Sequence, residues 1–203
     1  MTQSTNQELA NLLFPDVTKT VEDYEKEYPL RPAWTTVTRI APSPTGFLHM
    51  WSLYNALVAE RFAHQSDKNG VFFLRIEDTD QKREVPWAVQ QLIDGLRVFG
   101  IHPDEWPIGE NNADIWNYWP YTQSHRKEIY QAFVKELVAK GKAYPCWMSQ
   151  KEIDDTRAMQ DAAKKIPWIY GPYAKWRDAD FAAQKDMIEA GEPFVIRLYS
   201  PAT

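Results

Sequence analysis

Residues 37–52 read Val37-Thr-Arg-Ile-Ala-Pro-Ser-Pro-Thr-Gly-Phe-Leu-His-Met-Trp-Ser52. The apolar, β-branched run at 37–41 meets two proline breakers, which predicts a buried strand that enters a tight loop. Ser52 can cap a helix after this loop, because its hydroxyl can accept an unpaired N–H group of the first helical turn. The stretch therefore predicts a strand, a loop and the start of a helix.

The following residues complete a unit that is typical of parallel sheets. The helix has an inward face at near-helical spacing, formed by Leu53, Ala56, Leu57 and Ala63. Residues 71–76, Val-Phe-Phe-Leu-Arg-Ile, are a second predicted strand. A strand, a helix and a strand of these lengths form a right-handed crossover between parallel strands. The sequence therefore predicts an α/β fold with a parallel sheet.

Chemistry-bearing residues lie where a ligand of such a sheet is expected, outside the carboxyl ends of the strands. His49 lies at the loop-to-helix junction, and Glu77, Asp78 and Asp80 follow the second strand, so we expect one crevice between them. A helix N-terminus beside an imidazole suits a polyphosphate, and a neighbouring carboxylate suits an ammonium group. These residues suggest a site for ATP and an amino acid, although Asp78 and Asp80 would equally suit a helix cap.

The motif APSPTG-x-LH at 41–49, followed by RIEDTD at 75–80, resembles the glutamyl-tRNA synthetases, the class I aminoacyl-tRNA synthetases for glutamate. The similarity runs from about Thr35 to Thr203; the glutamine enzymes are expected to differ in both motifs. It implies the first half of a Rossmann-like nucleotide-binding domain at 35–110 and the start of an α+β connective insertion at 111–203. Residues 1–34 would be an extension without chemistry. The resemblance further implies an N-terminal fragment with little or no aminoacylation activity on its own.

The resemblance also implies roles for individual residues. Arg39 would hold the side-chain carboxylate of glutamate, Ser43 would support the substrate, and Glu77 would receive the α-ammonium group. His49, which matches the first histidine of the HIGH signature, would stabilise charge on the ATP phosphates, with Ser52 beside it in the catalytic site. The ATP site would comprise Pro44, Thr45, Gly46, His49 and Trp51.

The expected ligands follow from the same resemblance. ATP would bring Mg²⁺, and the partners would be L-glutamate and the glutamate tRNA, with the glutamine tRNA left open. Cys146 is the single cysteine, so we expect no zinc site and no metal held by the protein. The net charge of −5 argues weakly against nucleic acid, although basic residues between Lys82 and Lys165 could form a local patch. No apolar run approaches the roughly 20 residues of a membrane span, and we expect a cytoplasmic protein.

Trp51 departs from the resembled pattern, because it stands where the family has a glycine against which the adenine lies. Five further tryptophans occupy turn contexts that are typical of glycine: Trp87, Trp106, Trp116, Trp119 and Trp168. Exchanging all six for glycine would raise the glycine count from 8 to 14, the usual proportion of roughly 7%. We hypothesise that one codon, most simply UGA, means glycine in the source and was rendered as tryptophan.

Two alternatives keep the tryptophans as written. The chain could be a non-catalytic paralogue that acts as a binding module, with Trp51 closing the adenine pocket or with an exposed aromatic surface for a partner. It could also resemble the shortened enzymes that glutamylate a modified base of the aspartate tRNA (glutamyl-Q tRNA(Asp) synthetases). Trp147 and Trp176 lack a glycine-like context, and Trp34 is undecided.

The remaining elements are predicted from periodicity and caps. Helices are expected at 17–28, 85–99, 124–141 and 178–190, with Ser124 as a cap and glycines at 100, 141 and 191 as stops. Ser149 and Glu152 form a capping box that opens a further helix, and residues 194–199 predict a strand. The expected inward residues are Val85, Ala88, Val89, Leu92, Ile93, Leu96, Phe99, Ile129, Phe133, Val134 and Leu137.

Overall fold

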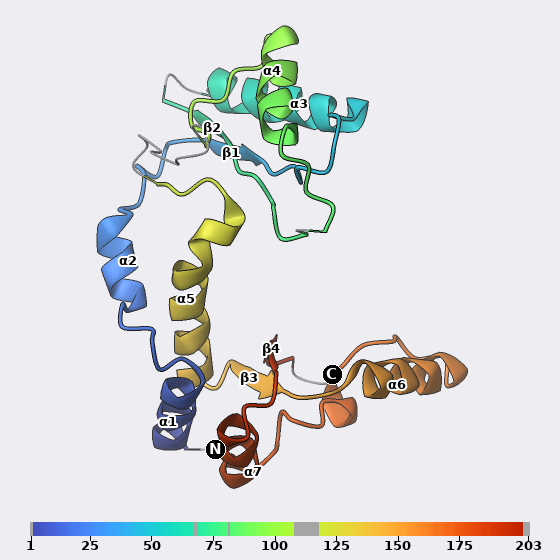
Figure 1. Cartoon of the computed structure of the whole chain (residues 1–203). Helices are drawn as coiled ribbons and strands as arrows, with labels where there is room; N and C mark the ends of the chain where they lie inside the picture. The colour runs from blue at the N-terminus through green and yellow to red at the C-terminus, as the bar shows by residue number, and fades with distance from the viewer. Residues whose placement is uncertain (1, 67–68, 81, 108–117, 201–203) are drawn as a thin grey trace. The chain divides into compact units, whose positions relative to one another are not determined.

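The computed structural model describes residues 2–66, 69–80, 82–107 and 118–200 (Figure 1). The chain forms two compact units, one built from residues 22–128 and the other from residues 1–21 together with 129–203. The sequence suggested divisions near residues 34 and 110, and position 110 lies outside the described residues. The N-terminal segment thus contributes to both units.

The unit at 22–128 contains the predicted crossover. β1 (Val37–Ile40) and β2 (Val71–Leu74) pair in parallel, and α3 (Met50–Ser66) connects them (Figure 1). The α/β class is therefore confirmed, although β2 ends at Leu74 rather than at residue 76. Isolated parallel bridges also join Phe73 of β2 to Glu105, and Ile76, two residues after β2, to Thr122. Later chain segments therefore lie along β2 and its continuation.

α3 and α4 (Ala88–Val98) supply helical residues to the core of this unit. The core comprises Ile40, Leu53, Ala56, Ala63, Phe72, Leu74, Ile76, Leu92, Ile93, Leu96 and Ile101. Two predicted inward residues are wrong: Leu57 is 38% exposed on α3, and Phe99 is 58% exposed beyond the end of α4. Gly100 ends α4 with φ +66°, as predicted, because a left-handed residue suits glycine at a helix end.

The predicted cap at Ser52 is wrong, because α3 begins at Met50. The N–H groups of Ser52 and Leu53 both donate to the carbonyl oxygen of His49, at 2.9 and 3.1 Å. The carbonyl of His49 therefore starts the helical ladder, and Ser52 lies within the first turn.

The other unit combines helices with an antiparallel strand pair. Its core joins α1 (Gln3–Leu13), α5 (Lys127–Ala139) and α7 (Phe181–Glu189), and its buried members are Leu9, Ala10, Leu13, Val138 and Ala143. β3 (Ala143–Cys146) pairs with β4 (Val195–Leu198). Cys146 is buried in a second cluster with Tyr144, Ile169 and Ala174. The sequence predicted β4, but it missed β3.

The predicted helix at 17–28 is wrong in extent, because α2 spans only Val21–Glu27. β-Branched residues at 17–20 disfavour a helix, and acidic residues in the first turn favour a start at Val21. α1 was missed entirely, although the Thr2 hydroxyl accepts from the N–H of Thr5 as an N-cap. Residues 2–34 therefore contain two helices, α1 and α2.

The later helices follow the predicted signals with shifted ends. The capping box of Ser149 and Glu152 opens α6 (Gln150–Ala162), as predicted. α7 begins later than predicted, with Asp180 as its cap, and Gly191 follows it with φ +71°. Phe133 is 43% exposed on α5, so its predicted inward position is wrong. Short 3₁₀ turns occur at Gln123–Arg126 and Gly171–Tyr173.

Across the described residues, no helix has the length and apolar character that a membrane crossing requires.

Candidate functional site

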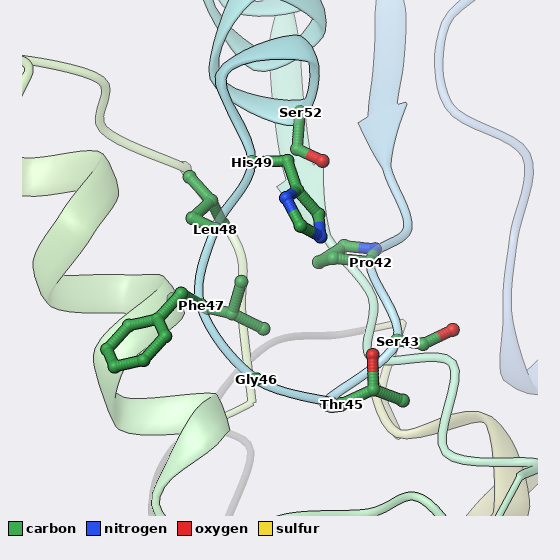
Figure 2. Close-up of a pocket in the computed structure, with 9 residues that line it drawn as sticks. Pro42, Ser43, Thr45, Gly46, Phe47, Leu48, His49 and Ser52 are labelled. Atoms are coloured by element: carbon green, nitrogen blue, oxygen red, sulfur yellow. The ribbon is translucent and has the colours of Figure 1, made fainter.

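A pocket of about 370 Å³ lies at the loop between β1 and α3 (Figure 2). Its lining combines backbone and polar groups of the loop with apolar side chains from the loop and from α4. The lining residues are Pro42, Ser43, Thr45, Gly46, Phe47, Leu48, His49, Ser52 and Leu92. Five of the residues predicted for the site therefore share one concave surface, namely Ser43, Thr45, Gly46, His49 and Ser52. Pro44, which was also predicted, is buried beside this lining.

The loop owes its shape to backbone bonds and to one glycine. The N–H of Thr45 donates to the carbonyl of Ser43 at 2.9 Å, and the N–H of Val85 donates to that of Pro44 at 2.9 Å. Gly46 has φ +139°, a backbone conformation that residues with an L side chain rarely adopt. His49 is the last residue before α3, and its ring points toward Pro42 (Figure 2). The His49 imidazole and the first turn of α3 therefore lie at the same pocket.

Glu77 lies next to the pocket through the backbone. Its N–H donates to the carbonyl oxygen of Pro42 at 2.9 Å, and the N–H of Arg75 donates to that of Ile40 at 3.0 Å. The side chain of Glu77 pairs with Arg75 at 3.0 Å and is not part of the pocket lining. The structure thus brings Glu77, the first acidic residue of the motif, beside the pocket loop. The guanidinium of Arg75 holds its carboxylate.

The two aspartates of the acidic motif have structural partners. Asp78 is buried, and it accepts hydrogen bonds from the N–H of Ser124 at 2.9 Å and from the Ser124 hydroxyl. Asp80 pairs with Arg83 at 2.6 Å on the surface. Because its hydroxyl donates to Asp78, Ser124 does not cap a helix, and that prediction is wrong. Asp78 instead anchors the 3₁₀ turn that precedes α5.

Arg39 and Trp51 lie outside this pocket. Arg39 is exposed on β1, opposite Phe73 in the parallel register. Trp51 is 70% exposed, and its ring stacks on Tyr54 with centroids 5.7 Å apart, so the indole does not fill the described pocket. Phe47 was missed by the sequence reasoning, although it lines the pocket and packs against Trp87 at 5.3 Å. Its position directly after the loop glycine was the available signal.

Comparison with known proteins decides the family. Residues 35–203 match the family described as class I tRNA synthetases for glutamate and glutamine (E and Q), catalytic domain. The chain belongs to this family. It is 49% identical over 195 residues to a glutamate–tRNA ligase of Clostridium perfringens (strain 13 / Type A). The aligned region covers 95% of this chain and 35% of that relative. A glutamate–tRNA ligase of Acetivibrio thermocellus is 46% identical over 196 residues, with the same two shares.

Solved structures of the family share the fold. The crystal structure of a glutamate-tRNA synthetase from Elizabethkingia anophelis matches with a TM-score of 0.68 and 32% identity, over 83% of this chain and 33% of that chain. The chain thus spans about a third of the length of the family members that it matches. The clostridial alignment is longer than residues 35–203, so it includes part of the N-terminal segment.

That segment has a buried anchor in the unit at 22–128, which the sequence reasoning missed. Arg31 donates to both carboxylate oxygens of Glu105, at 2.5 and 2.7 Å, and its guanidinium lies 4.0 Å from the ring centroid of Tyr118. The Tyr121 hydroxyl also donates to Glu105. Glu105 in turn bridges to β2 through Phe73. In this family member, residues before the matched region therefore fix an edge of the sheet.

Proposed function

We propose that this chain supplies the ATP- and glutamate-binding part of a glutamate–tRNA ligase. The observation that carries the proposal is the pocket in which His49 and the start of α3 meet the loop at 42–48, with Glu77 bonded to Pro42. In the reaction, the α-carboxylate of glutamate attacks the α-phosphate of ATP and pyrophosphate leaves. The glutamyl group then passes from the adenylate to the terminal ribose of the tRNA.

The residues would act by position and charge. Helix N–H groups and the His49 imidazole can donate to phosphate oxygens as negative charge shifts in the transition state. Ser52 lies within the first turn of α3 and lines the same pocket. The ATP site would comprise Pro44, Thr45, Gly46, His49 and Trp51.

Glutamate would lie on the side of the pocket nearest β2. Arg39 would hold its side-chain carboxylate, Ser43 would support it, and Glu77 would receive its α-ammonium group. Glu77 pairs with Arg75 at 3.0 Å, so the incoming ammonium would share or replace that partner. An anion exchanges one cation for another at modest cost when it is partly exposed to water, as the Glu77 side chain is at 35%.

Mg²⁺ would arrive with ATP. Among the residues that the structure describes, no group of three or more His, Cys, Asp or Glu side chains could hold a metal ion. An Mg²⁺ ion that the phosphates of ATP carry needs only one or two protein carboxylates. The partner would be the glutamate tRNA, with the glutamine tRNA left open as a second substrate, and the location would be the cytoplasm.

Titration of a non-hydrolysable glutamyl-adenylate analogue by calorimetry tests the proposal. We expect binding by the parent chain and a roughly 10- to 100-fold weaker affinity for His49→Ala, since a hydrogen bond to a charged group is worth about 1.5–3 kcal/mol. His102→Ala is the matched control, because His102 is an exposed histidine of the same unit outside the pocket lining. Equal affinities of the two variants would count against the assigned role of His49.

A second candidate is a non-catalytic binding module, which the exposed indole of Trp51 at the start of α3 favours. Titration of Trp51→Gly separates the two functions. Binding by this variant and not by the parent supports the synthetase site with an obstructing side chain. Absence of binding by both chains, each shown to be folded by circular dichroism, overturns the ligase proposal. The third reading, glutamylation of a modified tRNA base, shares the adenylate site and differs in the acceptor.

A further inference from the structure

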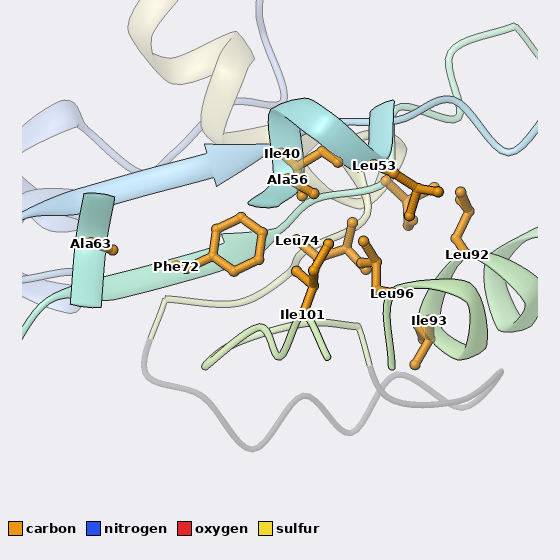
Figure 3. Packing of buried hydrophobic residues seen from close by; sticks show 11 residues of the cluster. Ile40, Leu53, Ala56, Ala63, Phe72, Leu74, Leu92, Ile93, Leu96 and Ile101 are labelled. Atoms are coloured by element: carbon orange, nitrogen blue, oxygen red, sulfur yellow. The ribbon is translucent and has the colours of Figure 1, made fainter. Parts of the chain in front are cut away.

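The chain at the end of β2 alternates between two faces of the strand pair. Phe72 and Leu74 are buried in the core with residues of α3 and α4, and Ile76 continues this inward face (Figure 3). Successive side chains of an extended chain point to opposite faces, so Arg75 and Glu77 lie on the face away from this core. Both residues are partly buried there.

Arg39 of β1 lies on the same face as Arg75 and Glu77. Arg39 is paired in register with Phe73 of β2, and paired residues of neighbouring strands point to the same side of a sheet. The face thus carries the guanidinium groups of Arg39 and Arg75 together with the carboxylate of Glu77. These charges complement those of glutamate, which has two carboxylates and one ammonium group.

Arg75 holds Glu77 through one oxygen of its carboxylate. The Nη2 group of Arg75 donates to Oε1 of Glu77 at 3.0 Å. An ionised carboxylate has two oxygens, each of which can accept hydrogen bonds, and the Glu77 side chain is 35% exposed. The second oxygen, Oε2, can therefore accept from an incoming ammonium group while Oε1 keeps its bond to Arg75.

The guanidinium of Arg75 is confined at a cost. Its side chain is only 18% exposed, and its Nε–H is buried without a hydrogen-bond partner among the described residues. Buried donors without a partner are rare in folded proteins, because each one loses its bonds to water and gains none in return. The backbone N–H of Arg75 donates to the carbonyl oxygen of Ile40 at 3.0 Å, which fixes the residue beside β1. The bond to Glu77 accounts for a guanidinium that its own donors do not explain.

We propose that Arg75 is a positioning residue for the amino-acid substrate, which it serves by staying bonded to Oε1 of Glu77 and directing Oε2 toward the α-ammonium group of glutamate. The inference rests on the proposed function and assigns a role to a residue outside the pocket lining. A carboxylate that is already held pays less conformational entropy when it meets its ligand than one that turns freely in water. Each oxygen takes one cation, so the negative charge of Glu77 lies between Arg75 and the substrate.

Two non-hydrolysable analogues test the role of Arg75 by calorimetry on the full 203-residue chain. One is the glutamyl-adenylate analogue, and the other is its glutaryl counterpart, in which hydrogen replaces the α-ammonium group. The ratio of their affinities, which we call the ammonium preference, measures the contact with Glu77 separately from the rest of the site. We expect Arg75→Gln to lower the ammonium preference about 10-fold and to leave the affinity for the glutaryl analogue unchanged.

Two further variants complete the comparison. Arg75→Lys keeps a cation without the planar guanidinium, so it should give an ammonium preference between those of Arg75→Gln and the parent. Arg83→Gln is the matched control, because Arg83 pairs with Asp80 of the same motif at 2.6 Å and is 71% exposed. We expect this control to keep the ammonium preference of the parent.

An ammonium preference of Arg75→Gln that equals or exceeds that of the parent overturns the inference. An equal loss of affinity for both analogues also overturns it, because a purely structural role lowers both. If Arg75→Gln is unfolded by circular dichroism, Arg75→Lys decides, and a lowered preference supports the role whereas an unchanged one overturns it.

The same titrations separate this inference from the proposed function. A parent chain that prefers the glutamyl analogue independently of Arg75 overturns the inference alone. Where only Trp51→Gly binds, the substitutions are made in that chain. Absence of binding of both analogues to the folded parent and to Trp51→Gly overturns the proposed function and the role of Arg75 with it.

Discussion

The N–H of Glu77 donates to the carbonyl oxygen of Pro42 at 2.9 Å. This bond continues the parallel register of β1 and β2 beyond the strand ends, where Arg75 already bonds to Ile40. It therefore aligns the acidic motif with the pocket loop, although the two motifs are far apart in the sequence. The polar ends of two strands meet at one edge of the sheet, as the ligand rule for parallel sheets requires.

Replacement of Asp78 by alanine should destabilise the chain. The buried carboxylate accepts from the backbone N–H and the hydroxyl of Ser124, and its loss would leave those donors without this acceptor. We expect a loss of about 1–3 kcal/mol in the free energy of unfolding, measured by urea denaturation. Asp80→Ala is the control, because its pair with Arg83 is largely exposed and should contribute about 0–1 kcal/mol. Equal losses for the two variants would show that Asp78 is not an anchor.

The anchor of the N-terminal segment can be tested in the same way. Arg31→Ala removes the bidentate partner of Glu105, whose side chain is only 12% exposed. Breaking a well-buried pair costs about 3–5 kcal/mol, and we expect less here, about 1–3 kcal/mol, because Arg31 is 21% exposed and Tyr121 still donates to Glu105. Arg97→Ala, in a surface pair with Asp94, should change the urea midpoint little. A midpoint for Arg31→Ala that matches this control would contradict the anchoring role.

The parts that the sequence predicted are those governed by local rules. Gly100, Gly141 and Gly191 end helices with positive φ, and the capping box opens α6, because each signal depends on residues within one turn. The parallel pair β1–β2 followed from a strand, helix and strand order.

Several errors have a different cause, because the competing partner lies far away in the sequence. Ser124 fails as a cap because Asp78 takes its hydroxyl, and β3 becomes a strand through its pairing with β4. The pair of Arg31 with Glu105 likewise joins residues that are 74 positions apart. In the candidate site, the loop and His49 were accessible from motifs, whereas the inclusion of Leu92 and the exclusion of Arg39 from the pocket required coordinates.

Acid should weaken the capping box of α6. The pKa of Glu152 is lowered from its ordinary 4.5 to about 2. The main cause is the hydrogen bond from the N–H of Ser149, and the second is the hydrogen bond from the side chain of Lys175. A carboxyl with a lowered folded-state pKa stabilises the fold above pH 4.5, and this contribution is lost as the pH falls toward 2. Glu152→Gln keeps a side chain that can cap but cannot titrate. We expect its melting temperature to fall below that of the parent at pH 7 and to converge with it by pH 2; a constant gap across this range would contradict the assignment.

The nine tryptophans fall into environments that bear on the codon hypothesis. Four of those in glycine-like contexts are largely exposed, at 45–70%: Trp51, Trp87, Trp119 and Trp168. Trp106 is partly buried against the core, and Trp116 lies outside the described residues. By contrast, Trp147 and Trp176 pack together at 4.8 Å, and the indole N–H of Trp147 donates to the carbonyl of Glu192 at 3.1 Å. The tryptophans outside glycine-like contexts thus include the pair with a defined packing role.

Intact mass of the protein produced by its own source decides whether the six residues are glycine. We expect a mass lower than that of the written sequence by six tryptophan-to-glycine exchanges, because these six tryptophans stand in sequence contexts that are typical of glycine. Peptide sequencing across Trp87 and Trp147 provides the internal comparison, since only the first should read as glycine. The six-glycine chain, made recombinantly, should also bind the glutamyl-adenylate analogue more tightly than the written chain, because position 51 then admits a ligand close to the backbone of α3. A native mass equal to that of the written sequence would leave the tryptophans genuine and favour the binding-module reading.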